Sequence, residues 1–386
     1  MTLVQNPRQL TVLRLVRRYG PITRAQIGLR AKLSASQVSR LTSELIETGL
    51  IETERAPAVS RNRPADRLML SAEKHATVGL DIGGVAQQAV VANFRGEVIA
   101  SIQDSVNLAV QPEALVDYLD GLIRRVLAQA GVSEEQVLGL GLAFRAIVDP
   151  NLGVITRGPE SPFWTNSWTN LAVRELLLAR FPGKHIAVDD TVRVLGLAEA
   201  RHGLGARESD FVYILADAGI GAALLINGKT YIGPSRISGE IGHLTIDPNG
   251  PVCACGKRGC IETYASSQAM LERANREQPG IAATVGELDG RAREGDALAI
   301  RVLSEAGAIF GRGLAVLLNV LGPRLIVVSG ANAVSDIYLA AAWQAAKAGA
   351  IEQASRDVRV IPSRLGPLAG ATGSAAMILD QLFEAR

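Results

Sequence analysis

The segment GEIGHLTIDPNGPVCACGKRGCIE, residues 239–262, contains every cysteine of this chain, with a histidine upstream of the first. Three thiolates and one imidazole make a Cys3His set, the ligand count of a closed, tetrahedral structural zinc site. The alternative is a group of buried thiols without a metal, since cysteine often behaves as a small apolar residue. Because every cysteine lies close to the histidine, we predict that a structural Zn2+ binds His243, Cys253, Cys255 and Cys260. Four protein ligands leave zinc no open position, so the metal is not expected to be catalytic.

The composition is that of a folded protein. The chain has 386 residues, 48% of them hydrophobic, which predicts two or three domains. The N-terminus lacks the apolar segment of a signal peptide, and no run of about 18 apolar residues predicts a membrane span. Clustered, metal-binding cysteines fit a reducing compartment. We therefore expect a cytoplasmic protein without membrane contact.

Positive charge is concentrated at the N-terminus. Residues 1–75 hold 13 Lys and Arg against 6 Asp and Glu, a balance of +7, whereas the remainder holds 27 against 32, a balance of −5. A basic module on an acidic body indicates a polyanionic partner for the first part. The alternative is a solvated basic face, which charge alone does not exclude.

The first 75 residues have the pattern of a winged helix-turn-helix. Apolar spacing predicts helices from Arg8 to Tyr19, from Thr23 to about Leu33, and from Ser34 onward, the last opened by an S-x-x-Q capping box. The third helix has an apolar face and a face of small polar residues with one arginine near its start, as a helix that enters the major groove requires. The predicted DNA-contacting residues of this helix are Ser34, Ser36, Gln37, Ser39 and Arg40.

Two short strands, 50–54 and 67–70, predict a hairpin after the third helix. The loop between them carries Arg61 and Arg63, which we expect to contact phosphate or the minor groove as a wing. The alternative is a helical bundle used for protein contact. The helix pattern, the capping box, the basic wing and the charge together favour double-stranded DNA.

From residue 76 onward, strands alternate with helices, and three buried strands each end in a glycine turn. The three turns are DIGG at 81–84, AGIG at 218–221 and VSGA at 328–331. Each turn alone is a weak indication of phosphate binding. Together they predict a two-lobed, ATPase-like α/β fold.

These residues bring the chain to a known family. DIGG, GEIGH at 239–243, CACGKRGCIE at 253–262 and LGPLAGATGSAA at 365–376 resemble the ROK family (repressors, open reading frames, kinases). The resemblance covers essentially the whole chain and implies an α/β, actin-like or sugar-kinase-like body of ribonuclease H type behind the winged helix-turn-helix. We expect a DNA-binding domain over 1–75, lobe 1 over 76–200 completed by a C-terminal helix at about 368–386, and lobe 2 over 201–367 with the zinc loop.

The resemblance also implies where a sugar binds. Glu240, His243 and Glu262 stand where family members hydrogen-bond sugar hydroxyls, with one imidazole nitrogen on zinc and the other on the sugar. Asp190 and Arg193 complete the expected effector site. Arg193 suits hydroxyls, but it suits an anionic ligand such as a sugar phosphate or acid equally well.

Kinase activity needs a carboxylate that accepts a proton from the sugar hydroxyl. Family kinases carry it in a segment like V-E-N-D-A-N-A-A-A-L-A-E, and the matching segment here is VDDTVRVLGLAE, 188–199. Aligned without gaps, Thr191 stands at the base position and Arg193 at the second Asn, and threonine is no general base near neutral pH. A one-residue slip would restore Asp190, but it needs a gap inside an expected helix.

Other family positions for phosphate and sugar are also changed. Val85-Ala86 replaces Thr-Lys, Ala218 replaces a threonine, and Phe163-Trp164 replaces Asn-Leu after Ser-Pro. The sequence therefore predicts a sugar-responsive regulator, most simply a repressor, that binds an inverted repeat as a homodimer or dimer of dimers and is not an enzyme. A ROK sugar kinase with a DNA-binding head and a regulator controlled by a protein partner stay open as alternatives.

Overall fold

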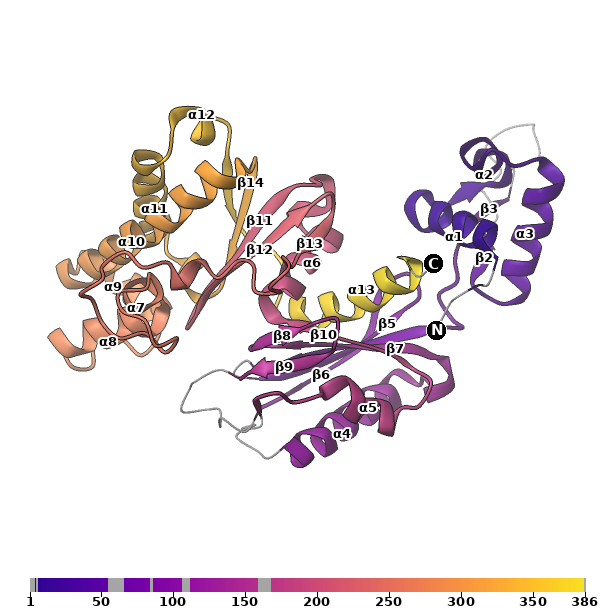
Figure 1. Ribbon diagram of the computed structural model, residues 1–386, viewed down its shortest axis with the longest axis horizontal. Helices are drawn as coiled ribbons and strands as arrows, with labels where there is room; N and C mark the ends of the chain where they lie inside the picture. Colours follow the sequence, from indigo (N-terminus) through magenta and orange to yellow (C-terminus); the bar gives the residue numbers. More distant parts are fainter. Residues whose placement is uncertain are drawn as a thin grey trace. The chain divides into compact units, whose positions relative to one another are not determined.

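The structure is a computed structural model that describes residues 4, 6–54, 66–83, 86–105, 112–158 and 168–384. The chain forms two compact units, residues 1–191 with 370–386, and residues 192–369 (Figure 1). The predicted domain boundaries remain a prediction, because these units group the N-terminal module with the first lobe.

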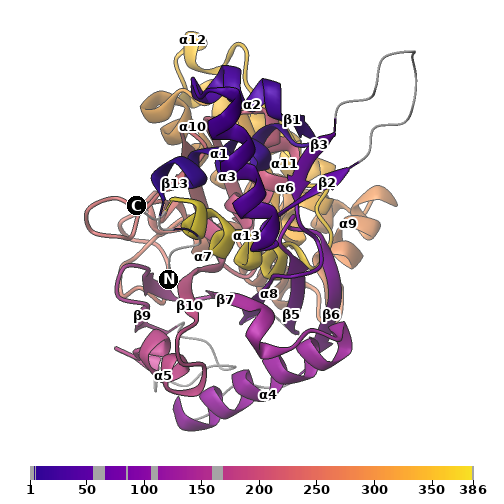
Figure 2. The same cartoon turned by 90° about the vertical axis from the view of Figure 1, so that its right-hand side faces the viewer.

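The first unit opens with three helices and a small sheet. Its elements are α1 (Pro7–Tyr19), β1 (Ile22–Thr23), α2 (Arg24–Ala31), α3 (Ala35–Glu47), β2 (Ile51–Glu54) and β3 (Arg67–Leu70). The strands pair in the order β1-β3-β2, all antiparallel, so β2 and β3 form the predicted hairpin beside α3 (Figure 2). Val38, Leu41 and Leu45 are buried on the inner face of α3. The helix expected to reach Leu33 ends at Ala31, because Lys32 adopts a left-handed conformation with φ 54°.

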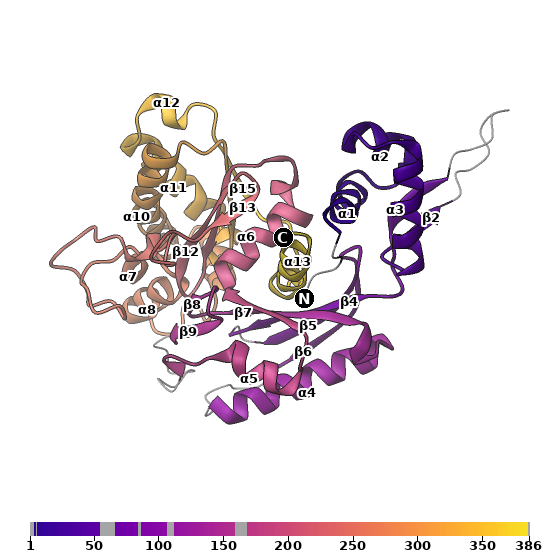
Figure 3. The ribbon, with the colours of Figure 1, turned by 45° about the vertical axis from the view of Figure 1, so that its right-hand side comes forward.

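The rest of the first unit contains a five-stranded sheet with helices on both faces and a two-stranded antiparallel sheet formed by Ile147–Asp149 and Val154–Arg157. Its elements are β4 (Ala76–Ile82), β5 (Gln87–Asn93), β6 (Val98–Asp104), α4 (Pro112–Ala130), β7 (Val137–Phe144), β8 (Ile147–Asp149), β9 (Val154–Arg157), α5 (Val173–Arg180), β10 (His185–Asp190) and α13 (Ala369–Glu384). The strand order is β10-β7-β4-β5-β6, with a parallel half and an antiparallel meander. Helices α4 and α5 lie on one face and α13 on the other (Figure 3).

The second unit repeats this strand topology. Its elements are α6 (Thr191–His202), β11 (Phe211–Ala216), β12 (Ile220–Ile226), β13 (Lys229–Tyr231), α7 (Glu262–Ala265), α8 (Ser267–Glu277), α9 (Val285–Arg293), α10 (Ala297–Leu321), β14 (Leu325–Ser329), α11 (Asp336–Gly349), α12 (Glu352–Ser355) and β15 (Arg359–Pro362). The order is β13-β12-β11-β14-β15, again a meander beside parallel strands. The predicted fold class, a winged helix-turn-helix followed by two mixed α/β lobes, is confirmed.

Helix α10 is the longest apolar helix described. By length and composition alone it could cross a membrane, but 61% of its most apolar window is buried inside the protein. Its buried side chains, such as Phe310 and Leu314, belong to the main core of the second unit. A core helix of a folded domain passes the same test, so α10 is weak evidence for a membrane span.

Candidate metal centre and ligand site

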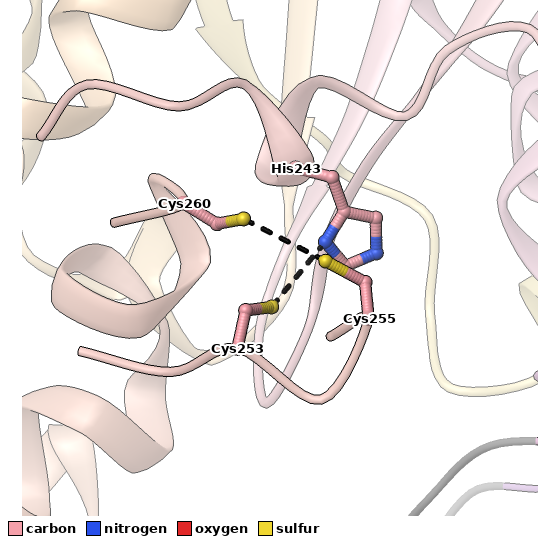
Figure 4. Close-up of side chains that lie close together, drawn as sticks. All are labelled: His243, Cys253, Cys255 and Cys260. Atoms are coloured by element: carbon pink, nitrogen blue, oxygen red, sulfur yellow. Dashed lines mark hydrogen bonds between the residues drawn. The ribbon is translucent and has the colours of Figure 1, made fainter. Parts of the chain in front are cut away.

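The four predicted metal ligands lie together in the second unit. Their ligand atoms are all within 4.8 Å of one another, as Figure 4 shows. Cys253 Sγ lies 3.6 Å from His243 Nδ1, and Cys255 Sγ lies 3.7 Å from Cys260 Sγ. A tetrahedral zinc ion with Zn–S of about 2.3 Å and Zn–N of about 2.0 Å separates its ligands by about 3.6–3.8 Å. The side chains therefore fit zinc.

The loop that carries the sulfurs is held by main-chain contacts. Cys253 N donates to Lys257 O over 2.7 Å, and Gly259 N donates to Pro251 O over 2.8 Å. Gly259 has a φ of 63°, and a side chain there would lie 1.6 Å from Asp247 O, so only glycine fits. These bonds fold the loop so tightly that sulfurs from both of its arms face one point.

Burial makes the thiols dependent on a cation. Cys253 and Cys260 are buried. Desolvation raises the pKa of Cys253 and raises the pKa of Cys260 to about 12, because the charged thiolate is unfavourable away from water. A metal ion would supply the missing positive charge, and zinc binds thiolates and releases their protons.

His243 connects the sulfur cluster to an acidic residue. It lies in the short 3-10 helix η4 (Ile241–His243) with Nδ1 toward the sulfurs and Nε2 3.8 Å from Glu240 Oε2. Glu240 remains 44% exposed, although the protein on its other sides desolvates the carboxylate and raises its pKa, against the attraction of His243 and Arg193. One ring nitrogen therefore faces the metal cluster, and the other faces a group that a ligand can reach.

Glu262 is the second acidic residue of this neighbourhood. Its Oε2 accepts a hydrogen bond of 2.8 Å from Ile220 N, where the AGIG turn enters β12. Its charge also raises the pKa of Glu240. Arg193 is buried and donates to Arg236 O over 3.2 Å. The second unit therefore gathers Glu240, His243, Glu262 and Arg193, four of the five residues predicted for the effector.

The fifth predicted residue, Asp190, belongs to the first unit, at the end of β10. Thr191 follows and opens α6, so the strand ends and the helix begins between the two residues. The Thr191 hydroxyl donates to Asp81 Oδ1 over 3.3 Å, and burial raises the pKa of Asp81 to about 6. Sequence reasoning did not predict this pair, because it depends on β4 and β10 ending at the same edge of one sheet.

The candidate DNA-binding residues lie around the start of α3. Ser34 accepts from Gln37 N over 3.3 Å, and Gln37 Oε1 accepts from Ser34 N over 3.0 Å, which is the predicted capping box. Ser36 and Ser39 are exposed. Arg40 is 62% exposed and pairs with Glu44 at 3.2 Å, a contact that was not predicted. Arg61, Arg63 and the Phe163-Trp164 pair lie outside the described residues.

Comparison with known families matches the N-terminal module and the two lobes to different family models. The ROK family model matches residues 77–381, and the MarR family model matches residues 6–61. The chain is 24% identical to the xylose repressor of Caldicellulosiruptor bescii over 99% of this chain and 98% of the relative. It is 28% identical to the DNA-binding transcriptional dual regulator NagC of Escherichia coli, over 87% and 83% of the two chains.

Solved structures include both a regulator and kinases. A ROK family transcriptional regulator, a homologue of the Escherichia coli MLC protein, matches with a TM-score of 0.85 at 23% identity, over 98% of this chain and 97% of that chain. The ROK hexokinase of Thermus thermophilus matches with a TM-score of 0.66 at 27% identity, over 78% of this chain and 96% of that chain. Of these two structures, the regulator matches almost the whole chain and the kinase matches a smaller part of it.

Proposed function

Because the chain belongs to the ROK family, we propose that it is a sugar-responsive transcriptional regulator without kinase activity, acting as a repressor. The observation that carries this proposal is the combination of a MarR-type module with a ROK body, shared over 99% of the chain with a xylose repressor. In this proposal it acts in the cytoplasm, on the nucleoid.

The winged module reads the operator. Helix α3 enters the major groove, where Ser36, Ser39 and Arg40 meet base edges or phosphates while Ser34 and Gln37 hold the helix start. Arg61 and Arg63 reach phosphate or the minor groove. The chain acts as a homodimer or dimer of dimers, and two-fold symmetry then requires an inverted-repeat operator.

The effector is a carbohydrate or a sugar derivative. Glu240, Glu262 and the Nε2 of His243 offer hydrogen-bonding groups for hydroxyls, and Arg193 adds positive charge beside them. Asp190 is the fifth residue that we propose for effector binding. Zinc, held by His243, Cys253, Cys255 and Cys260, is structural and fixes the orientation of the imidazole.

Effector binding changes operator affinity only through its different affinity for two arrangements of the protein. We propose that the effector favours an arrangement of the two units in which the paired DNA-binding modules no longer match the half-site spacing. Sugar binding therefore releases the operator.

A mobility-shift titration on the DNA upstream of the chain's own gene tests the proposal. D-xylose and N-acetyl-D-glucosamine are the first probes, because a xylose repressor and an N-acetylglucosamine repressor of Escherichia coli are among the relatives. Their phosphates and hexoses follow. We expect salt-sensitive binding of a dyad-symmetric footprint and release by one of these sugars. A footprint without dyad symmetry, or the same affinity with every sugar, contradicts the proposal, and the second outcome favours a protein partner as the effector.

A matched pair of variants tests the site. Glu262→Gln keeps the size of the side chain and removes the charge, so we expect the sugar concentration for half-release to rise about tenfold or more, because a charged hydrogen-bond acceptor is lost. Glu272→Gln changes an exposed glutamate of α8 that accepts a hydrogen bond from Gln268, and we expect no change. Equal responses in both variants would remove Glu262 from the site.

A sugar kinase is the second candidate, because a ROK hexokinase matches at 27% identity. The hydrogen bond from Thr191 to Asp81 disfavours it, since the residue at the expected base position is a hydroxyl donor to a carboxylate. A coupled ADP-release assay with hexoses, pentoses and amino sugars decides between the two. Turnover that disappears in Asp190→Asn would establish a kinase with Asp190 as its base.

A further inference from the structure

The first turns of α13 lie directly on strand β4. A side chain on Gly79 would come within 2.0 Å of Ala371 O, and a side chain on Gly370 would come within 2.0 Å of Asp81 Oδ2. Ser374 Oγ donates to Leu80 O over 2.7 Å. Three consecutive strand residues therefore contact the start of α13, and the glycines allow helix and strand to approach this closely.

Asp81 is placed where the chain passes between its two units. The chain leaves the first unit after Thr191 and returns to it at Gly370. Asp81 accepts a hydrogen bond from Thr191 and lies against the backbone of Gly370, so one carboxylate touches both crossings. A negative charge also suits the first turn of a helix, because the backbone amides there carry partial positive charge.

The other end of α13 is bonded to the DNA-binding module. Its last turn carries no basic residue, although basic residues commonly satisfy the final carbonyls of a helix. Two arginines of α1 take this place: Arg14 Nε donates to Phe383 O over 2.7 Å, and Arg17 donates to Leu379 O over 3.4 Å. Arg17 also pairs with Asp380 and lies 4.6 Å from the centre of the Phe383 ring.

Further contacts join the DNA-binding module to the five-stranded sheet of the first unit. Arg95, in the turn after β5, pairs with Glu52 of β2 at 2.5 Å and donates to Leu70 O over 2.8 Å. Phe94 stacks on Phe383 with ring centres 5.5 Å apart. Contacts from α1, from β2 and from the end of β3 thus join the module to the sheet and to α13.

We propose that Asp81 is a positioning residue for DNA binding. Asp81 holds the first turn of α13 next to Thr191 and Gly370, where the chain leaves and re-enters the first unit. The last turn of α13 is then correctly placed to bind α1. A rearrangement at the crossings then reaches the DNA-binding module through one helix. This inference rests on the proposed regulatory function for its biological meaning, but the coupling itself is a property of the chain without DNA or sugar.

Hydrogen exchange on the full-length protein tests the coupling. Thr191→Val removes the hydroxyl that bonds Asp81 while keeping the shape, and Asp81→Asn removes the charge. We expect amides of α1 to exchange about five- to tenfold faster in Thr191→Val, the factor by which loss of one buried hydrogen bond shifts a local opening. We expect a smaller increase in Asp81→Asn, because a neutral amide oxygen replaces the charged acceptor of the same bond. Asp149→Asn is the matched control, because Asp149 is a buried aspartate of the same unit that bonds Asn151 N and Leu152 N.

Exchange in α1 that is unchanged in Thr191→Val and Asp81→Asn, or equally faster in Asp149→Asn, overturns the proposal. A second measurement covers the case in which exchange rises everywhere through general loss of stability. Arg17→Gln breaks the far end of α13, and its effect on operator affinity is measured alone and together with Thr191→Val. Distant sites normally act independently, so the double variant departs from the product of the single effects by about fivefold or more if α13 couples them.

The outcomes separate this inference from the proposed function. If the effects of Arg17→Gln and Thr191→Val on operator affinity simply multiply in the double variant, the coupling is wrong. Operator binding and sugar release are unaffected by that result. If amide exchange in α1 is faster in Thr191→Val but the protein binds no operator, the coupling is supported and the proposed function is wrong.

Discussion

The Cys3His cluster and the Asp81–Thr191 pair are both sites where buried polar groups meet, but they are assembled in opposite ways. The four ligands lie within residues 243–260 and are brought together by the folding of one loop. Asp81 and Thr191 are separated by 110 positions and meet only because β4 and β10 belong to one parallel arrangement of strands. The cluster depends on residue spacing, whereas the pair depends on the topology of the whole sheet.

The two sites also handle buried charge differently. In the cluster, thiols with a raised pKa can become thiolates when a metal ion balances their charge. In the pair, Arg145 and the Thr191 hydroxyl lower the pKa of Asp81, but desolvation outweighs both and raises it to about 6. The stability of the second unit should therefore depend on a metal, and that of the first on pH.

Loss of the metal should have the largest effect. Structural zinc contributes about 10–16 kcal/mol in small zinc domains, so we expect Cys260→Ser, or chelation, to destabilise the second unit by about 5 kcal/mol or more. Calorimetry with metal analysis of the purified protein measures this. Ala254→Ser places the same hydroxyl at an exposed position of the loop and should change neither metal content nor stability.

A Cys260→Ser protein that retains full stability would break the comparison, because the cluster would then be held by its loop alone. The main-chain bonds at Cys253 and Gly259 make this a real alternative.

The next effect in size is the pH dependence caused by Asp81. Its pKa is about 6 in the folded chain against an ordinary value of 3.8, so between these values the folded state binds more protons than the unfolded state. Stability from this group is therefore complete below about pH 4 and is lost as pH rises through 6. Relative to Asp81→Asn, the wild type should lose at most about 3 kcal/mol between pH 4 and pH 7.

Urea unfolding of the wild type and of Asp81→Asn at several pH values measures the difference between their free energies of unfolding. The contributions of the other carboxylates are the same in both proteins and cancel in this difference. A difference that stays constant with pH would mean that Asp81 is as well solvated as an ordinary carboxylate. Thr191→Val should raise the pKa of Asp81 in the folded protein further, because the hydroxyl that stabilises the carboxylate is gone.

The two sites also differ in how far they could be predicted from the sequence. The cluster of His243 with the three cysteines and the capping box of α3 were predicted correctly as groups, because their members lie close together in the sequence. The fold class followed from periodicity and glycine turns. The Asp81–Thr191 bond and the arginines of α1 on α13 were not predicted, since strand order and helix placement decide them.

A smaller effect on stability is expected from the N-cap of α3, which, like the metal cluster, is formed by residues close together in the sequence. Ser34 caps α3 by accepting from Gln37 N, so Ser34→Ala should destabilise the DNA-binding module by about 1 kcal/mol, as loss of an N-cap does. Ser43→Ala, at an exposed position of the same helix, is the control and should be neutral within about 0.5 kcal/mol. Chemical denaturation followed by a module-specific probe checks both. Equal effects would show that the cap contributes nothing beyond helix propensity.

The smallest expected effect is that of the Arg40–Glu44 pair. Arg40 is largely exposed and Glu44 is about one third exposed, with 62% and 36% of their surface accessible, so solvent screens their attraction. A double-mutant cycle with Arg40→Gln and Glu44→Gln should give a coupling of about 0.3–0.5 kcal/mol in stability, falling with added salt. Glu44 also accepts from Gln9 of α1 over 2.7 Å, so Glu44→Gln alone should cost more than Arg40→Gln alone. If Arg40→Gln proves the more destabilising change, Arg40 is fixed by the fold and is less free to reach DNA than its exposure indicates.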